Sequence, residues 1–459
     1  MDFAEKHDLI DLQEVLKGRV TEECLALYNV DGSMRKTAKS KILQCFHRNK
    51  YDGTPPRYSS LVDMGLIWRL ATPTTDDRDI KRRCGNDYKW VDYLDKVVSM
   101  VFSRHRNAKL IVLVNDVYTN SCIKDDEHDR RAAKQTNLPN VYPKESDNFP
   151  TISQFQKIML KSENKTRLQK LLQQRFRARI AEIPGQVIYC QGNFAENLTT
   201  GQPDTRFIFD HAEADTMMLT GYSIIRNNGD VDEVIIDTED SDVNVQAAFV
   251  SKKLPGNLLI KNKQALIKSK EDVSDEMAEI VIALYELTGS DHNSGFFGHG
   301  KKKVFEKAKK DPEARKLLVG VGENLVLEND VRRNMKKFVL SVLYGLNSEL
   351  CSEARASKWK KMKKKSMARL PPDDDSLNHH CDRTNYLSYC LKHFHLRSHP
   401  SPIGHGFETI NGRCRPIRYN NPALPENFSP TMDTTDVESG DESGIEYGEN
   451  SEAEGEEED

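Results

Sequence analysis

Apolar and polar positions repeat along the chain with two different periods, which predict strands and helices in turn. Residues 109–116, KLIVLVND, form a continuous apolar run with a polar end, as expected of a strand buried on both faces. Residues 60–70 predict a short strand that runs directly into a helix, and residues 90–102 carry apolar side chains at helical spacing. The start of the chain therefore indicates a strand–helix–strand unit.

The same alternation continues through the middle of the chain. The segments 186–190, 206–219 and 232–243 predict two or three more strands with a helix among them. Residues 274–291 predict a helix that ends at a Gly turn, and residues 329–345 predict another helix.

Strands that alternate with helices over residues 58–300 predict an α/β domain with a mostly parallel central sheet. The acidic end of the chain lacks the apolar residues that a core needs, so we expect it to be disordered. The predicted organisation is an N-terminal helical extension at 1–57, a core at 58–310 with an insertion at about 120–205, a helical basic segment at 311–370, a His- and Pro-rich segment of little periodicity at 371–428, and a disordered acidic tail at 429–459.

The charge is divided unevenly along the chain. The formal net charge is −4, but thirteen acidic residues and no Lys or Arg lie from Asp433 onward, so the preceding residues carry about +9. A basic body with an acidic tail favours a polyanionic partner, with the tail as a solubilising or self-competing arm. The alternative is that both charges belong to solvated surface.

Cysteine usage and the N-terminal sequence indicate the compartment. The nine cysteines are odd in number and scattered, with no CxxC pair, which favours reduced thiols in the cytosol or nucleus. The start of the chain lacks the apolar core of a signal peptide, and no apolar run approaches a membrane span. The basic cluster 358–365 predicts nuclear localisation or a nucleic-acid contact, with a cytoplasmic protein as the alternative. No P-loop occurs, so we expect no nucleotide cofactor.

Acidic residues follow the predicted strands at the points where those strands end. Asp63 ends one apolar run, Asp116 ends the next, and Asp240 and Asp242 follow the run 234–236. Residues two apart in an extended segment point the same way, so Asp240 and Asp242 can aim at one point. The carboxyl ends of parallel strands share one edge of a sheet, where ligands bind, so all four carboxylates can converge.

Three further carboxylates lie at predicted helix ends. Glu213 and Asp215 stand where a helix begins, and Asp291 follows a Gly helix stop. Any one of these acids is typical of a turn or a helix cap. Seven convergent carboxylates, however, cannot all stay ionised in a small volume without cations among them. An all-oxygen ligand set suits Mg²⁺ or Mn²⁺, and two such ions are the usual machinery for hydrolysis of phosphodiester bonds.

Three motifs resemble the signatures of flap endonuclease/XPG-type nucleases of the PIN-like superfamily: TEDSD (238–242), EAD (213–215) and LTGSDHNSGFFGHGKKKVFEKA (287–308). The resemblance covers about residues 58–310 and implies a PIN-like three-layer domain. More narrowly, the sequence of the last motif is similar to that of uncharacterised animal proteins of this type, which are suspected of mobile-element origin. The resemblance implies a metal-ligand set for two Mg²⁺ or Mn²⁺ ions that consists of Asp63, Asp116, Glu213, Asp215, Asp240, Asp242 and Asp291.

The last motif also predicts a nucleic-acid contact. In the family, a glycine-containing hairpin grips the duplex backbone. Gly298 and Gly300 permit a tight turn here, the amides of the following helix can bind phosphate, and Lys301, Lys302 and Lys303 add positive charge. The alternative is a Gly turn before a basic surface helix.

Basic residues after Asp116 match the family's phosphate-steering residues in placement. Lys124 and Arg130 or Arg131 would neutralise charge in the transition state. The insertion would stand where the family has a helical arch over single-stranded nucleic acid, and its basic helix at 164–180 would line that arch. The alternative to phosphate steering is an exposed, salt-bridged helix, and the alternative to the arch is a solvated basic helix face.

The predicted function is divalent-metal-dependent endonucleolytic hydrolysis of nucleic acid, structure-directed, with DNA favoured and RNA possible. The alternatives are a catalytically inactive nucleic-acid-binding or scaffold protein descended from such a nuclease, and an RNA-directed PIN-like ribonuclease. The sequence departs from flap endonucleases in the roughly sixty residues before Asp63 and in His299 between the hairpin glycines. A His- and Cys-containing stretch at 379–395 matches no standard zinc finger.

Overall fold

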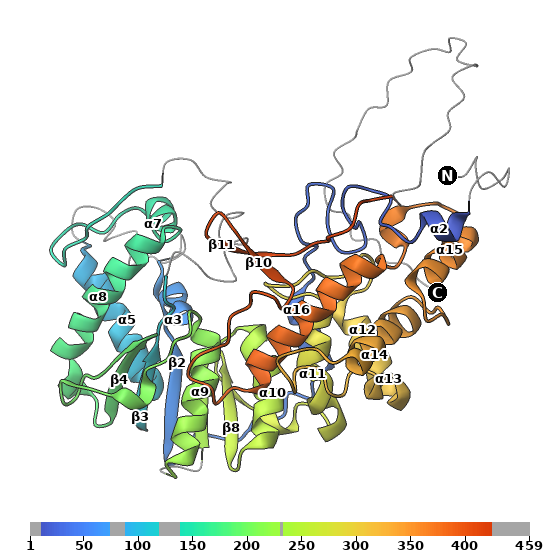
Figure 1. Cartoon of the computed structure of the whole chain (residues 1–459). Helices are drawn as coiled ribbons and strands as arrows, with labels where there is room; N and C mark the ends of the chain where they lie inside the picture. The colour runs from blue at the N-terminus through green and yellow to red at the C-terminus, as the bar shows by residue number, and fades with distance from the viewer. Residues whose placement is uncertain (1–10, 74–87, 119–137, 230–232, 425–459) are drawn as a thin grey trace.

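The computed structural model describes residues 11–73, 88–118, 138–229 and 233–424 (Figure 1). Within these ranges a central sheet carries helices on both faces, and the residues after about 300 continue into a helical region beside it. No described helix has both the length and the apolar composition that a membrane crossing requires. The predicted acidic tail at 429–459 lies outside the described residues.

The central sheet is mixed and runs in the order β1-β9-β8-β7-β2-β3-β4-β5-β6. The five middle strands, from β8 to β4, are parallel, and the two strands at each edge pair antiparallel. The predicted α/β class is confirmed, but half of the described pairings in this sheet are antiparallel, so "mostly parallel" holds only for its centre. The strands are β1 (Lys50–Tyr51), β2 (Tyr58–Asp63), β3 (Ala108–Val114), β4 (Gln186–Gln191), β5 (Phe194–Asn197), β6 (Gln202–Pro203), β7 (Glu233–Asp237), β8 (Asn257–Asn262) and β9 (Ala265–Lys268).

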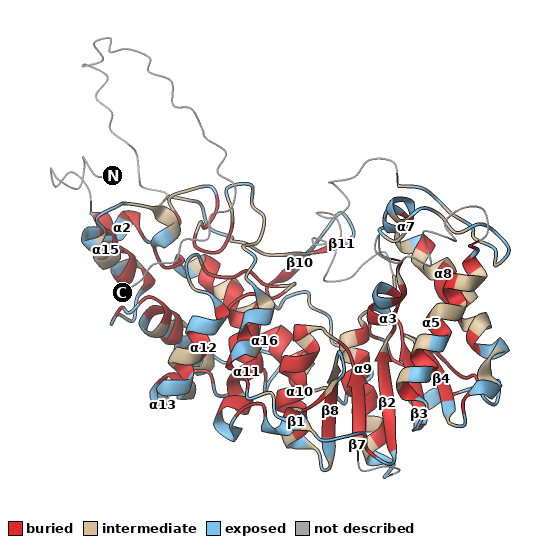
Figure 2. Cartoon of the chain, turned by 180° about the vertical axis from the view of Figure 1, so that it is seen from behind, coloured by how far each residue is buried: buried red, intermediate tan, exposed pale blue. Residues whose placement is uncertain are grey.

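Helices cover both faces because successive strand residues point to opposite sides of the sheet. Leu61 and Ile236 pack into the cluster that includes α9 and α10, whereas their neighbours Val62 and Ile235 pack into the cluster that includes α3, α5 and α8. Figure 2 shows the buried strands of the sheet, with mostly buried helices α9, α10 and α11 beside them and helices α5 and α8, which also carry exposed residues. The covering helices are α9 (Ala214–Asn227) and α10 (Ser241–Lys253), with α11 (Asp275–Leu287) packed on α10, on one side. On the other side they are α3 (Met64–Ala71), α5 (Trp90–His105) and α8 (Ser162–Ala178), with α7 (Ile152–Ile158) packed against the start of α5.

The described part of the predicted insertion is not an arch. β4 is one of the five central parallel strands, and α8 lies against α5 in the layer that covers the sheet. Arg175 of α8 makes two hydrogen bonds of 2.6 Å to Asp95 of α5, Arg179 also bonds to Asp95, and Phe176 is fully buried. These arginines therefore bind helices together. Residues 119–137 of the predicted insertion lie outside the described residues.

The N-terminal segment differs from the predicted helical extension. Its described part holds one four-residue helix, α2 (Leu12–Val15), one 3₁₀ helix, η1 (Lys39–Cys45), and strand β1, and is otherwise irregular. Leu12 and Leu16 pack against Trp359. β1 pairs with β9 at the edge of the sheet, so the segment is part of the core and not an appendage.

The residues after 300 form the helical region. Helix α16 is 19 residues long and lies in the segment 371–428, where the sequence pattern shows little periodicity. The shorter helical turns are η2 (Ile180–Glu182), η3 (Thr205–Phe207) and η4 (Ser269–Glu271) before this region and η6 (Met367–Arg369) within it. The elements of the helical region are α12 (Lys301–Lys310), α13 (Pro312–Lys316), α14 (Asn329–Lys337), which continues as the π-helix η5 (Phe338–Leu343), α15 (Cys351–Lys361), α16 (Asp374–Lys392) and the hairpin β10 (Phe407–Ile410) and β11 (Arg413–Pro416).

Candidate metal centre

The candidate site lies where the central parallel strands end. Asp63 is the last residue of β2 and Asp116 follows β3 by two residues, as the sequence predicts. Asp63 caps helix α3 by accepting a hydrogen bond of 3.2 Å from the amide of Leu66. Asp116 accepts a hydrogen bond of 2.9 Å from the amide of Ala214, so it ties the end of β3 to the start of α9. Hydrogen bonds from amides at the start of α3 and α9 thus fix both carboxylates at one edge of the sheet.

The carboxylate of Asp63 stands in an unfavourable environment for its charge. Burial, and then the carboxylates of Asp116 and Asp240, raise the pKa of Asp63 to about 6. The amide of Leu66 and the hydroxyl of Thr238, which donates to Asp63 Oδ2 at 3.2 Å, oppose this rise. Three acidic groups from three separate segments therefore lie within electrostatic reach of one another.

A second group of acids is close enough to share one ion. Asp215, Asp240 and Asp242 each offer a carboxylate oxygen, and these three oxygens lie within 4.8 Å of one another. Asp240 caps helix α10 by accepting a hydrogen bond of 2.9 Å from the amide of Asp242, and Asp215 lies in the first turn of α9. Partly buried carboxylate oxygens at this spacing fit a hard divalent cation such as Mg²⁺ or Mn²⁺. No other group of this kind occurs among the described residues, which include the His- and Cys-containing stretch at 379–395.

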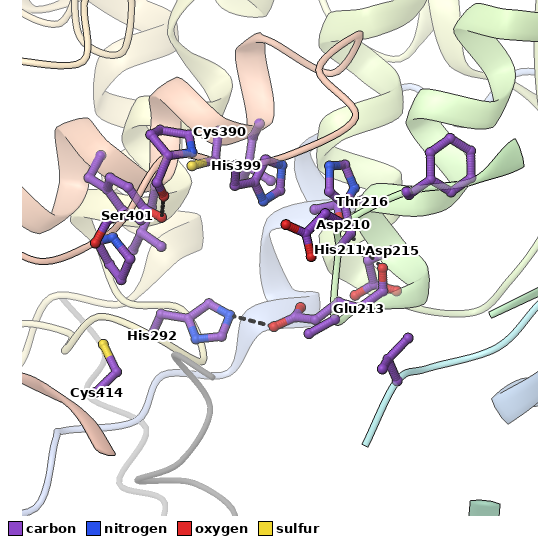
Figure 3. Close-up of a pocket in the computed structure, with 18 of the residues that line it drawn as sticks. Asp210, His211, Glu213, Asp215, Thr216, His292, Cys390, His399, Ser401 and Cys414 are labelled. Carbon is purple, nitrogen blue, oxygen red and sulfur yellow. Dashed lines mark hydrogen bonds and ion pairs between the residues drawn. The ribbon is translucent and has the colours of Figure 1, made fainter. Parts of the chain in front are cut away.

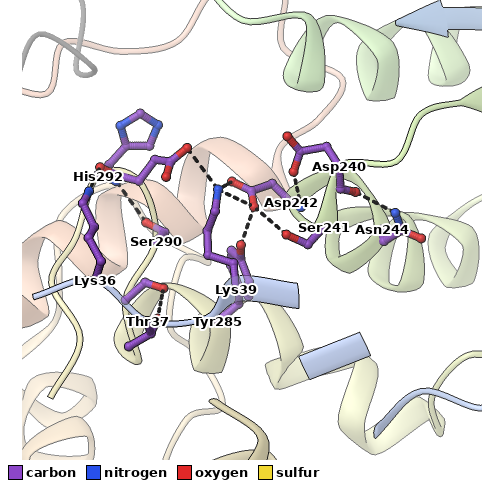
Figure 4. A network of polar contacts seen from close by, with 12 residues as sticks. Lys36, Thr37, Lys39, Asp240, Ser241, Asp242, Asn244, Tyr285, Ser290 and His292 are labelled. Carbon is purple, nitrogen blue, oxygen red and sulfur yellow. Dashed lines mark hydrogen bonds and ion pairs between the residues drawn. The ribbon is translucent and has the colours of Figure 1, made fainter. Parts of the chain in front are cut away.

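Asp242 and Asp291 are joined by a lysine that the sequence motifs do not indicate. Lys39 Nζ lies 3.0 Å from Asp242 Oδ1 and 3.0 Å from Asp291 Oδ2 (Figure 4). Burial alone would lower the pKa of Lys39, but the carboxylates of Asp242, Asp291 and Asp240 outweigh burial and raise it. The hydroxyl of Tyr285 donates a further hydrogen bond to Asp242. Asp291 therefore joins the cluster through Lys39.

Glu213 completes the set on the side of a neighbouring cavity. Its carboxylate lies 3.2 Å from Nε2 of His292, which directly follows Asp291 (Figure 3). The cavity has a volume of about 580 Å³, with Glu213, Asp215 and Asp242 on one wall and residues 386–414 of the C-terminal segment on another. All seven predicted carboxylates are thus grouped around one edge of the sheet, although the structure contains direct contacts only among some of them.

Two acids of the same sequence stretch serve other purposes. Asp237, the last residue of β7, is fully buried and binds Arg104 and His105 of α5. Glu239 forms an ion pair of 2.8 Å with Arg69 of α3. The density of acidic residues after β7 therefore has two causes, since Asp237 binds the sheet to α5 while Asp240 and Asp242 face the candidate metal centre.

The glycine-containing hairpin has the predicted turn, but only two of the three predicted lysines are exposed at the surface. Gly298 has φ +76°, a conformation that side chains disfavour, and Phe296 and His299 pair across the turn. Gly300 precedes the first residue of α12. Lys302 and Lys303 are exposed, as expected.

Lys301 is a correction to the predicted phosphate contact. Its side chain is buried, and its ammonium group donates to the carbonyl of Tyr285 and to Thr288 Oγ1. Burial lowers the pKa of Lys301, with the carboxyl group of Glu286 opposing that change. The lysine fixes the end of α11 against α12 from inside and cannot reach a phosphate on the surface in this conformation.

The predicted phosphate-steering residues Lys124, Arg130 and Arg131 lie outside the described residues. Sequence reasoning missed Lys39, Tyr285 and His292. Lys39 has no motif around it, and Tyr285 lies within an apolar helix pattern that only indicates packing. His292 adjoins Asp291 in the quoted motif, so its position was a signal that could have identified it.

Asp63→Asn is expected to raise the free energy of unfolding of the metal-free protein by about 2–3 kcal/mol at pH 7.5. The pKa of Asp63, about 6, lies some two units above the ordinary value for an aspartate, and each unit is worth about 1.4 kcal/mol. The folded protein binds the proton more tightly than the unfolded chain, so the cost of Asp63 is complete above pH 6 and disappears below about pH 4. The gain should therefore shrink as the pH falls.

Urea unfolding in EDTA at pH 7.5 and 4.5 measures this difference. Asparagine keeps the helix cap, so capping is not lost. Asp311→Asn is the matched control, since Asp311 caps helix α13 away from the site and is exposed. A loss of stability in Asp63→Asn at pH 7.5 would contradict repulsion among these carboxylates.

Comparison with known proteins places the chain in no family. No protein-family model matches the sequence, and no curated protein is significantly similar to it.

Proposed function

We propose that this protein is a divalent-metal-dependent nuclease that hydrolyses phosphodiester bonds of nucleic acid, of the flap endonuclease/XPG type in the PIN-like superfamily, and that it acts in the nucleus. The observation that carries the proposal is the grouping of seven acidic residues from separate segments. They lie at the edge of the sheet where its central parallel strands have their carboxyl ends. Folding alone opposes such a grouping, because like charges repel.

Each group of residues has a task in this proposal. Asp215, Asp240 and Asp242 hold the cation, and Asp63 and Asp116 orient water on its other side. A bound Mg²⁺ or Mn²⁺ supplies a lowered pKa for the attacking water and stabilises the charge that develops on the phosphate. Lys124, Arg130 and Arg131 remain proposed phosphate-steering residues.

The substrate would approach along two neighbouring features. The hairpin with Gly298 and Gly300 and the exposed Lys302 and Lys303 offers positive charge for the nucleic-acid backbone. The cavity beside Glu213 has the size of typical small-ligand sites, about 300–1,000 Å³, and so has room for one nucleotide next to the scissile phosphate.

One observation favours the alternative of an inactive, nucleic-acid-binding descendant. Lys39 neutralises part of the carboxylate cluster from within the chain. The cluster could then persist without a metal ion, so its presence alone does not require catalysis. The metal centre equally permits RNA as the substrate.

The test is cleavage by the purified protein of end-labelled flapped DNA, blunt duplex DNA, single-stranded DNA and single-stranded RNA. Mg²⁺ or Mn²⁺ should be required and excess EDTA should stop the reaction. The unfolding midpoint should also rise with Mn²⁺, since an ion at 100 times its Kd stabilises the folded state by about 2.7 kcal/mol. Stabilisation without cleavage of any substrate would favour the inactive alternative, and absence of both effects would refute the metal centre.

A further inference from the structure

Lys39 is held among the metal-binding acids by a segment that is itself fixed in place. The amide of Gly295 donates to the carbonyl of Arg35 at 2.8 Å, and the hydroxyl of Thr37 lies 3.3 Å from the carbonyl of Thr288. The segment therefore runs along the loop that carries Asp291. Figure 4 shows Thr37 and Lys39 on this segment, with the Lys39 side chain beside Asp242 of α10.

The other side of Lys39 is anchored as firmly. Phe46 packs against Phe305 of α12 with ring centroids 5.9 Å apart, and Ile42 is fully buried. Arg48 binds Asn244 of α10 at 2.7 Å and Asp272 at 3.3 Å. Contacts on both sides of η1 thus position the Lys39 ammonium group between α10 and the loop after α11.

The ammonium group occupies the space between Asp242 and Asp291. Its nitrogen lies 3.0 Å from an oxygen of each, and 3.1 Å from the second oxygen of Asp242. Divalent cations bind carboxylate oxygens at about 2.0–2.6 Å, so an ion bridging these two acids would overlap with the ammonium group and be repelled by it. The oxygens that Asp215, Asp240 and Asp242 offer for an ion remain grouped within 4.8 Å.

We propose that Lys39 takes the place of the second cation of a two-metal centre, so that the chain binds one divalent ion, at Asp215, Asp240 and Asp242. This inference rests on the proposed function. The positive charge that a second ion would supply comes instead from the N-terminal segment. Asp291 is a positioning residue that holds Lys39, and it is not a metal ligand in this protein.

The test is the number of Mn²⁺ ions bound per full-length chain, measured by calorimetry and by electron paramagnetic resonance of free Mn²⁺. The wild type should bind one ion. Lys39→Met should bind two, and Lys39→Met combined with Asp291→Asn should return to one. Lys41→Ala is the matched control, since Lys41 belongs to the same 3₁₀ helix but is exposed, and it should bind one.

Stability without metal gives an independent readout. In EDTA, Lys39→Met should have a lower unfolding midpoint than Lys41→Ala, and Mn²⁺ should restore most of the difference. If Lys39→Met does not fold, Asp291→Asn in the wild-type background still tests the role of Lys39. The number of bound Mn²⁺ ions should stay at one if Lys39 replaces the second ion, but it should fall from two to one if the wild type has a two-metal centre.

The outcomes separate this inference from the proposed function. Two ions in the wild type, or one ion in folded Lys39→Met, would overturn the role of Lys39 and leave the nuclease proposal standing. No bound Mn²⁺ in the wild type would overturn both.

Discussion

The double variant Asp240→Asn/Asp242→Asn should lose metal-dependent cleavage of nucleic acid by at least about 10²–10³-fold, the range found when one electrostatic contribution to the transition state is removed. The two residues provide two of the three oxygens that can share an ion. Asparagine is similar in size and keeps the cap of α10, but it removes two negative charges from the metal centre. Initial rates on the best substrate of the panel measure the loss.

The matched control is Asp311→Asn/Glu313→Gln. These residues hold the same positions, the cap and the first turn, in helix α13, and they are exposed. The control should cleave at the wild-type rate. Cleavage by the Asp240→Asn/Asp242→Asn protein that matches the wild type would mean that the activity arises elsewhere or in a contaminating nuclease.

A mutation that removes only the metal should also change the response of stability to the ion. The unfolding midpoint of the double variant should no longer rise with Mn²⁺, whereas that of the control should rise as in the wild type. The stability readout does not depend on the choice of substrate. It therefore distinguishes a lost metal centre from an untested substrate.

The sequence predicted the helices and strands whose buried residues form a continuous or regularly spaced apolar pattern. The apolar run at 109–116 is strand β3, and the helix within 274–291 is α11. Asp63 and Asp116 could be placed at one edge because parallel strands bring their carboxyl ends together. This inference needed only the strand ends, so it did not depend on side-chain detail.

Helix α16 escaped prediction because polar residues are interspersed among the apolar ones on its buried face. His380, Arg383, Thr384, Asn385 and Ser388 are all buried in it. The ring of His380 donates to the carbonyl of Leu287 at 2.9 Å, and Arg383 bonds to Asn293 and to Tyr28. A hydrophobic period cannot reveal a helix that is held by polar partners from distant segments.

Lys39 and Lys301 show the same limit for the site. A lysine is a poor candidate for burial from sequence, yet Lys301 is buried against Tyr285 and Thr288. Lys39 begins a short 3₁₀ helix about 200 residues away from its partner Asp242 in the sequence. Only the fold brings such groups together, because neither has a local pattern that encodes its partner.

Asp237→Ala should destabilise the protein by about 3–5 kcal/mol, because removal of one partner of a buried ion pair leaves the other charge uncompensated. Arg104 donates two hydrogen bonds to Asp237, at 2.8 and 2.6 Å, and His105 Nε2 lies 2.8 Å from it. The carboxylate can only accept, so Nε2 of His105 carries a proton and Nδ1 accepts from Ser60 at 2.9 Å. Urea unfolding at pH 7.5 measures the loss.

The pH dependence of this contribution follows from the direction of the pKa shift. Burial alone would raise the pKa of Asp237, but the hydrogen bonds from His105 and Arg104 lower it to about 2, below the ordinary value of 3.8. The stabilisation is therefore complete above about pH 4 and is lost as the pH falls towards 2. The difference between wild type and Asp237→Ala should be constant from pH 5 to 8 and shrink below pH 4. Asp95→Ala, which breaks partly exposed pairs with Arg175 and Arg179, should cost about 1 kcal/mol or less. An equally small loss in Asp237→Ala would show that the Asp237 pair does not hold β7 to α5.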